Sequence, residues 1–158
     1  MNAEPIGEPT CPRAQMKRRL PATLNAVEAL CRDLRDSVFA AIPAGECFVV
    51  ELLLREALTN AVVHGVNQDA ARTIECEVET MAGGIILRVR DDGEGFDWRA
   101  RLNQMPQALA ESGRGLEILR RYCARLQFND AGNGVEMVRT FDNARKEESV
   151  EGDNHAEL

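Results

Sequence analysis

The sequence predicts an α/β fold in which helical segments and the strands of one sheet share a single domain. Two segments place apolar residues at helical spacing, one beginning at Leu24 and one running from about Glu46 to His64. From Thr73 the period changes to strict alternation, which is typical of half-buried strands. At 158 residues, with 44% hydrophobic and 28% charged side chains, the chain is long enough to bury one core.

The N-terminal part is predicted to hold a leader, a strand and a helix. Residues 1–16 carry three prolines without apolar periodicity, which indicates a flexible leader. Lys17 to Ala22 is a predicted short strand that Pro21 ends. Pro43 and Gly45 end the helix that follows. The apolar stripe of that helix consists of Leu24, Val27, Leu30, Cys31, Leu34 and Val38.

The central helix carries an apolar stripe and a polar one. Its buried face is predicted to consist of Leu54, Leu58, Ala61 and Val62. Glu56, Asn60 and His64 follow at intervals of four residues, which stacks three polar side chains along the helix. An Asn inside an apolar helix is not explained by helix propensity. The stripe therefore indicates a carboxylate and an amide directed into one cavity, and a solvated polar face is the alternative.

A predicted hairpin leads into a glycine-rich segment. Its first strand alternates Ile74, Cys76 and Val78 with glutamates, and the chain returns across Gly83 and Gly84. The returning strand ends at an inward-facing acid, Asp91, which is costly to bury unless something receives it. The glycines that follow, Gly93 and Gly95, allow a bend and leave room for a ligand, although a plain turn is the alternative.

A long segment then leads to a second glycine motif. Residues 96–112 form a predicted lid or binding loop, because the segment is long for a compact domain. Its candidate ligand-covering residues are Trp98, Arg99 and Arg101, for which a surface patch is the alternative. Gly113, Arg114 and Gly115 open a helix, where backbone N–H groups and a cation favour a phosphate; an ordinary helix entry is the alternative. The predicted buried stripe of this helix is Leu116, Leu119, Cys123 and Leu126.

The C-terminal part is predicted to form a hairpin and a tail. Phe128 to Asp130 and Val135 to Phe141 pair across the Gly132–Asn133–Gly134 turn. From residue 143 to 158 the chain is polar and acidic, so we expect a disordered tail. The predicted domain therefore covers residues 17–142.

Composition narrows the classes of function and the compartment. The net charge of −7 argues against a direct nucleic-acid partner. No apolar run approaches the roughly 20 residues that span a bilayer, and the N-terminus lacks the apolar segment of a secretory signal. The five cysteines are widely spaced, without a C-x-x-C pair, and are predicted to be small buried thiols in a reducing cytoplasm.

In this order the motifs resemble those of the GHKL ATPase domain, a group named for gyrase, heat-shock protein 90, histidine kinases and a mismatch-repair protein. The matching segments are REALTNAVVHG, VRDDGEGFDW, SGRGLEILRRYCARLQF and VEMVRTF. The similarity is strongest to the small anti-sigma-factor serine/threonine kinases of bacterial partner-switching systems. It implies the Bergerat fold, an α/β two-layer sandwich whose mixed, mostly antiparallel sheet is covered on one face by three helices.

The resemblance also implies an ATP site with Mg²⁺. Asn60 would hold the metal, which the phosphates and water also bind. Glu56 would be the general base for a serine or threonine hydroxyl. The adenine amino group would be accepted by Asp91. His64 is expected to support the site rather than act in catalysis, and capping the end of its own helix is the alternative.

The remaining implied contacts concern the base and the phosphates. Gly93 and Gly95 would let the adenine pack against backbone, and Thr140 would support the adenine through its hydroxyl. The phosphate-binding residues would be Gly113, Arg114 and Gly115.

The function implied by the resemblance is that of a cytoplasmic kinase that phosphorylates an antagonist (anti-anti-sigma) protein and sequesters a sigma factor. One residue departs from the pattern: Glu111 stands where some close relatives have an arginine just before the Ser-Gly of the last motif. The alternative is a nucleotide-gated module that binds a partner without transferring phosphate, and a third reading is an ATPase module of another phosphorelay. Whether the chain forms a homodimer stays open.

Overall fold

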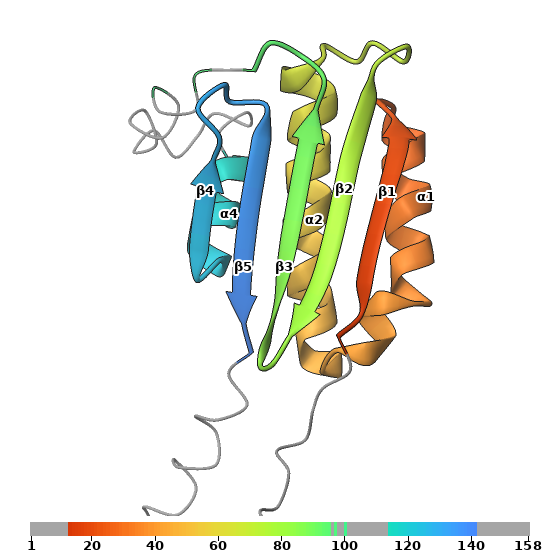
Figure 1. Ribbon diagram of the computed structural model, residues 1–158, viewed down its shortest axis with the longest axis vertical. Helices are drawn as coiled ribbons and strands as arrows, with labels where there is room; N and C mark the ends of the chain where they lie inside the picture. Colours follow the sequence, from red (N-terminus) through yellow and green to blue (C-terminus); the bar gives the residue numbers. More distant parts are fainter. Residues whose placement is uncertain (1–12, 96, 98–99, 101–113, 142–158) are drawn as a thin grey trace, which may run out of the picture.

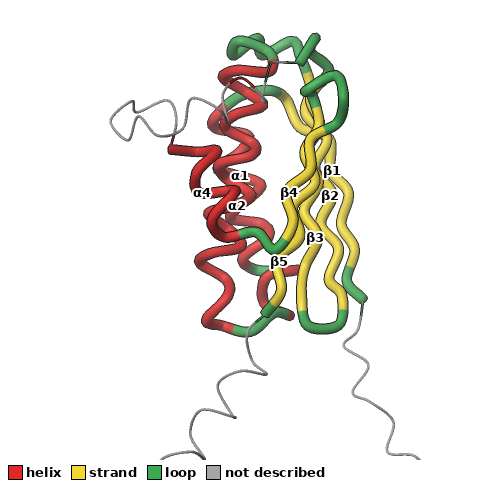
Figure 2. The backbone as a smooth tube through the Cα atoms, turned by 90° about the vertical axis from the view of Figure 1, so that its left-hand side faces the viewer, coloured by secondary structure: helices red, strands yellow, loops and turns green. Residues whose placement is uncertain are grey.

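The structure, a computed structural model, describes residues 13–95, 97, 100 and 114–141. One sheet packs against a layer of helices that covers only one of its faces (Figures 1 and 2). The predicted α/β two-layer sandwich is therefore confirmed. Most of the predicted leader and lid, together with Glu111, Gly113 and the predicted tail, lie outside the described residues.

The sheet has five strands in the order β1-β2-β3-β5-β4. Their bounds are Gln15–Pro21 for β1, Thr73–Met81 for β2, Gly84–Asp91 for β3, Arg125–Phe128 for β4 and Gly134–Thr140 for β5. Each pair of neighbouring strands is antiparallel, in agreement with the mostly antiparallel sheet that the resemblance implies. The alternation predicted for β2 is confirmed, because every second residue from Ile74 is buried. The first strand begins at Gln15, two residues inside the predicted leader.

The helices follow the predicted apolar periodicity. Helix α1 spans Leu24–Arg35. Its N-cap is Thr23, whose hydroxyl accepts a hydrogen bond from the Ala26 N–H at 3.1 Å. Short 3₁₀ turns at Val38–Ala41 (η1) and Ala44–Glu46 (η2) occupy the region of the predicted break. The other two helices are α2, Cys47–Asn60, and α4, Arg114–Tyr122. No helix of the described chain is both long and apolar enough to cross a membrane.

Helix α2 ends in an unusual turn. It continues as a π-helical turn, η3, at Ala61–Gly65, which is closed by the Val66 N–H donating to the Ala61 carbonyl at 3.1 Å. The predicted helical span is thus confirmed, but its last turn is wider than an α-helical one. Such turns frequently occur at functional sites.

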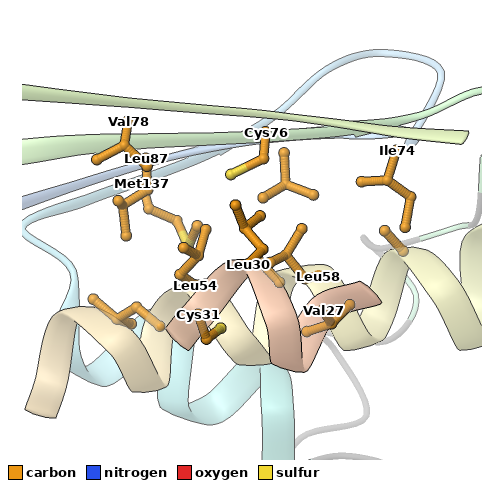
Figure 3. Close-up of a cluster of buried hydrophobic side chains, with 14 of the residues drawn as sticks. Val27, Leu30, Cys31, Leu54, Leu58, Ile74, Cys76, Val78, Leu87 and Met137 are labelled. Atoms are coloured by element: carbon orange, nitrogen blue, oxygen red, sulfur yellow. The ribbon is translucent and has the colours of Figure 1, made fainter. Parts of the chain in front are cut away.

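The core lies between the helix layer and the inner face of the sheet (Figure 3). Helix α2 contributes Leu54 and Leu58, both with no exposed area. Cys31 and Cys76 are also fully buried and unbonded, and burial raises the pKa of the Cys76 thiol to about 12. These two cysteines are the small buried thiols that the sequence predicted.

Ion pairs fasten α2 to α1. The Arg55 guanidinium donates to Glu28 on α1 and to Glu51 on its own helix, and Arg35 on α1 also donates to Glu51. Because of its contact with Arg35, Glu51 has a pKa below its ordinary value. The core contacts and these pairs together fix the position of α2 over the sheet.

The boundary between α4 and β4 differs from the prediction. The helix ends at Tyr122, whereas the predicted buried stripe extended to Leu126. Leu126 belongs to β4, where it lies opposite Met137, and the predicted strand at Phe128 to Asp130 starts three residues earlier, at Arg125. Strand pairing with β5 therefore overrides the helical spacing at this point.

The core packing predicts a large difference between two leucines. We expect Leu54→Ala to lower the free energy of unfolding by about 2–5 kcal/mol, because it leaves a cavity under the sheet. The matched control is Leu24→Ala, since 49% of Leu24 is exposed, and it should change stability by less than about 0.5 kcal/mol. Urea denaturation measures both, and equal losses would contradict this assignment of the core.

Candidate functional site

A pocket lies where α2, β3, α4 and the β4–β5 turn come together. The residues from α2, η3, β3 and α4 that line it are Ala57, Asn60, Ala61, Val89, Asp91 and Leu119. The lining residues from β4, the turn and β5 are Phe128, Gly132, Asn133, Gly134 and Val135. Asn60 and Asp91, predicted as ligand residues from separate motifs, thus face one space that opens to solvent.

Asp91 supplies a buried acceptor at the end of β3. Only 5% of the residue is exposed, and burial raises the pKa of its carboxyl above the ordinary value of 3.8. Its Oδ1 atom accepts a hydrogen bond from the Gly93 N–H at 2.8 Å. The carboxyl can still accept a hydrogen bond from a donor group of a ligand, since each oxygen carries two lone pairs.

The π-helical turn packs directly against this acid. A Cβ atom at Gly65 would lie 2.3 Å from the Asp91 Oδ2 atom, and one at Gly93 would lie 2.3 Å from the Gly65 carbonyl oxygen. No side chain fits at either position, so Gly65, Asp91 and Gly93 form one close-packed unit. Gly65 directly follows the predicted end of the central helix, and its contact with Asp91 explains why a glycine stands there.

The conformation of Gly95 also has a cause within the chain. Its φ is +86°, and a Cβ atom there would lie 1.8 Å from the Ala131 carbonyl oxygen. Packing within the chain therefore explains the glycines at 93 and 95. Their contact with an adenine ring stays a prediction.

The polar stripe of α2 meets the beginning of α4. A Cβ atom at Gly115 would lie 2.9 Å from the Glu56 Oε2 atom and 3.3 Å from the Asn60 side-chain oxygen and nitrogen. Gly115 thus allows α4 to approach both polar groups. Glu56 is half-buried but is not among the residues that line the pocket. Glu51 forms ion pairs with two arginines, whereas no ion pair among the described residues includes Glu56.

Three other predicted site residues occupy different parts of the structure. Thr140 is exposed and pairs with Gly84, at the opposite end of β3 from Asp91, so it is not part of this site. His64 is half-buried in η3. Arg114 begins α4 next to Gly115, as predicted.

The structure adds residues that the sequence analysis did not select. Asn133 and Phe128 line the pocket, and the Asn133 carbonyl accepts a hydrogen bond from the Asp91 N–H at 2.9 Å. The sequence signal is the Gly132–Asn133–Gly134 segment, which by itself indicates only a hairpin turn. Its position opposite the end of β3 depends on the strand order, which local sequence does not reveal.

The hydrogen-bonding and metal-binding groups of the site fit an adenine nucleotide with a divalent metal. Asp91 offers a buried acceptor for an amino group, and the Asn60 amide offers one oxygen of the kind that Mg²⁺ prefers. The backbone of the first turn of α4, beside Asn60, supplies N–H groups suited to phosphate. The base of such a ligand would thus meet Asp91, while its phosphates and metal would meet Asn60 and the first turn of α4.

The close approach at Gly115 predicts a variant that separates binding from stability. Gly115→Ala should weaken binding of ADP with Mg²⁺ about tenfold, because the added methyl group displaces Glu56 and Asn60. Stability should hold or rise slightly, since Ala favours helix over Gly. Gly45→Ala is the control, because a Cβ there meets nothing within 4 Å. Calorimetry and thermal unfolding test this; wild-type ADP affinity in Gly115→Ala would contradict it.

Comparison with known proteins identifies the family of this chain. A search of curated protein sequences finds no match. Among solved structures, the histidine kinase domain of a blue-light activated histidine kinase from Erythrobacter litoralis matches with a TM-score of 0.49 and 17% identity. The match covers 77% of this chain and 61% of that chain, so this chain spans less than two thirds of that domain. The family model for the histidine kinase-like ATPase domain matches residues 20–139, and the chain therefore belongs to that family.

Proposed function

We propose that this protein is a serine/threonine protein kinase that phosphorylates an antagonist (anti-anti-sigma) protein and acts as an anti-sigma factor by binding a sigma factor. Domains of its family bind ATP, usually with Mg²⁺, which supports a phosphotransferase or ATPase role. The observation that carries the proposal is the placement of Glu56 and Asn60 against Gly115 at the start of α4.

Two residues would hold the nucleotide. Asp91 accepts the adenine amino group, so that the buried carboxyl gains a donor besides the Gly93 N–H. The Asn60 amide oxygen would bind Mg²⁺, with phosphate and water as the other ligands. When bound, ATP supplies the phosphoryl group that is transferred. The residues Gly113, Arg114 and Gly115 are proposed to bind its phosphates.

Glu56 is proposed as the general base. Its carboxylate takes the proton from a serine or threonine hydroxyl of the antagonist as the hydroxyl oxygen bonds to the γ-phosphorus and the bond to the β-phosphate oxygen breaks. A base must be free to accept this proton. Glu51, one turn away on the same helix, could not easily serve, because Arg35 and Arg55 hold it in ion pairs.

The alternative function is a nucleotide-gated binding module without phosphate transfer. The observation in its favour is Glu111, an acid where some similar kinases have an arginine near the γ-phosphate. The nucleotide site is the same in both proposals, so only the transfer step separates them. We further propose that the protein acts in the cytoplasm and without direct contact to nucleic acid.

The two candidate functions predict different behaviour of two variants. Glu56→Gln should keep ADP affinity within a few-fold and lose about 10²–10⁴-fold in the rate of phosphate transfer to the antagonist. Asn60→Ala should lose both nucleotide affinity and transfer. Asp33→Asn is the matched control, because Asp33 is exposed on α1. The measurements are transfer of labelled phosphate to candidate antagonist proteins and titration with ADP.

Two outcomes would contradict the proposal in different ways. If the wild-type protein binds ATP and a partner but transfers no phosphate to any candidate antagonist, the nucleotide-gated module replaces the kinase. If Glu56→Gln transfers phosphate at the wild-type rate, Glu56 is not the base.

The raised pKa of Asp91 predicts a pH dependence of nucleotide binding. The charged carboxylate is the better acceptor, so ADP affinity should fall as the pH drops through the folded-state pKa, which lies above 3.8. The folded protein does not lose stability through this group, because burial disfavours the charged form and protonation removes that cost. Asp91→Asn is the control, since its amide does not titrate while the nucleotide phosphates titrate in both proteins. Parallel pH profiles for the two proteins would contradict the assignment.

A further inference from the structure

The turn between β4 and β5 is held by an asparagine pair. The Asn129 Oδ1 atom accepts hydrogen bonds from the Asn133 N–H at 3.0 Å and the Gly134 N–H at 3.1 Å. The Asn129 Nδ2 group donates to the Asn133 Oδ1 atom at 2.6 Å. One side chain thus fixes both the backbone and the amide orientation of Asn133.

Asn133 in turn contacts both ends of the bend that contains Asp91. Its backbone carbonyl accepts from the Asp91 N–H at 2.9 Å, and its Nδ2 group donates to the Gly93 carbonyl at 3.3 Å. Within that bend, the Gly93 N–H donates to the Asp91 Oδ1 atom. The Asn133 side chain therefore holds the carbonyl of Gly93, and the N–H of the same residue donates to the Asp91 carboxyl.

Two elements contact the bend. The first is the π-helical turn, where the Gly65 carbonyl occupies the space of a Cβ atom at Gly93. The second is Asn133, which donates to the Gly93 carbonyl and shares the lining of the pocket with Asp91. Because rigid supporting contacts decide how accurately a binding group is held, removal of one of these contacts should let the Asp91 carboxyl change its direction.

We propose that Asn133 is a positioning residue that orients the Asp91 carboxyl through Gly93 and thereby sets the preference for a 6-amino purine over a 6-oxo purine. This inference rests on the adenine assignment made under the proposed function, but it does not depend on phosphate transfer. The role requires an amide, because its two ends have opposite partners: Asn129 donates to the oxygen, and the Gly93 carbonyl accepts from the nitrogen.

The test compares ADP with IDP, which carries an oxygen where adenine has its amino group. Calorimetry with Mg²⁺ gives the dissociation constants of both nucleotides for wild type, Asn133→Ala and Asn133→Asp. Wild type should prefer ADP by at least about tenfold, since IDP places a carbonyl oxygen, which cannot donate, against the buried carboxyl. Asn133→Ala should reduce this preference roughly two- to tenfold, mainly through weaker ADP binding. Asn133→Asp should reduce it further, because it places a carboxylate oxygen against the Gly93 carbonyl.

The ratio of the two constants separates positioning from folding. A change that only destabilised the fold would weaken ADP and IDP equally, and thermal unfolding measures that effect independently. Asn129→Ala is the second variant, which should lower the preference through the same pair of asparagines, and exposed Asn25→Ala on α1 is the control. Wild-type preference in Asn133→Ala and Asn129→Ala would overturn the proposal. If wild type itself does not prefer ADP, the adenine assignment of Asp91 fails and this inference fails with it. Absence of phosphate transfer alone would contradict only the proposed kinase function.

Discussion

The burial of the Asp91 carboxyl is the constraint on which the rest of the site depends. Burial of an ionisable group at 5% exposure is unfavourable unless hydrogen bonds receive it, and the Gly93 N–H donates one to the Asp91 carboxyl. The neighbouring structure is built to hold this acid in place. The π-helical turn brings Gly65 against one carboxyl oxygen, and Asn133 binds the backbone on either side of the bend. A buried carboxyl held in this way can accept a further hydrogen bond from a donor group of a ligand.

The same helix that anchors the core also carries the chemistry of the site. Leu54 and Leu58 fill the space under the sheet, while Arg55 links α2 to α1. These contacts leave little freedom for the opposite side of the helix, where Glu56 and Asn60 meet the first turn of α4. Core packing therefore sets the positions of the proposed base and the proposed metal ligand. Functional groups on rigid elements are held more accurately than groups on loops, which suits a reaction that depends on alignment.

The sequence predicted the fold class and most elements because their periodicities were long and consistent. It failed where tertiary contacts decide. Leu126 fits a helical stripe, but pairing with β5 places it in a strand. Thr140 was selected from a motif, yet the register of β5 puts it at the far end of the sheet from Asp91. The importance of Asn133 depends on the strand order, which places the β4–β5 turn next to the end of β3, and no local pattern encodes that order.

Asp91 and Asn60 are proposed to hold the two ends of one nucleotide. A crystal structure of the protein with Mg²⁺ and a non-hydrolysable ATP analogue measures this arrangement directly. The adenine amino nitrogen is expected within hydrogen-bond distance of the Asp91 carboxyl, and the metal is expected to be bound by the Asn60 side-chain oxygen. A base that lies outside this pocket, with no atom of the nucleotide bonded to the Asp91 carboxyl, would contradict this placement.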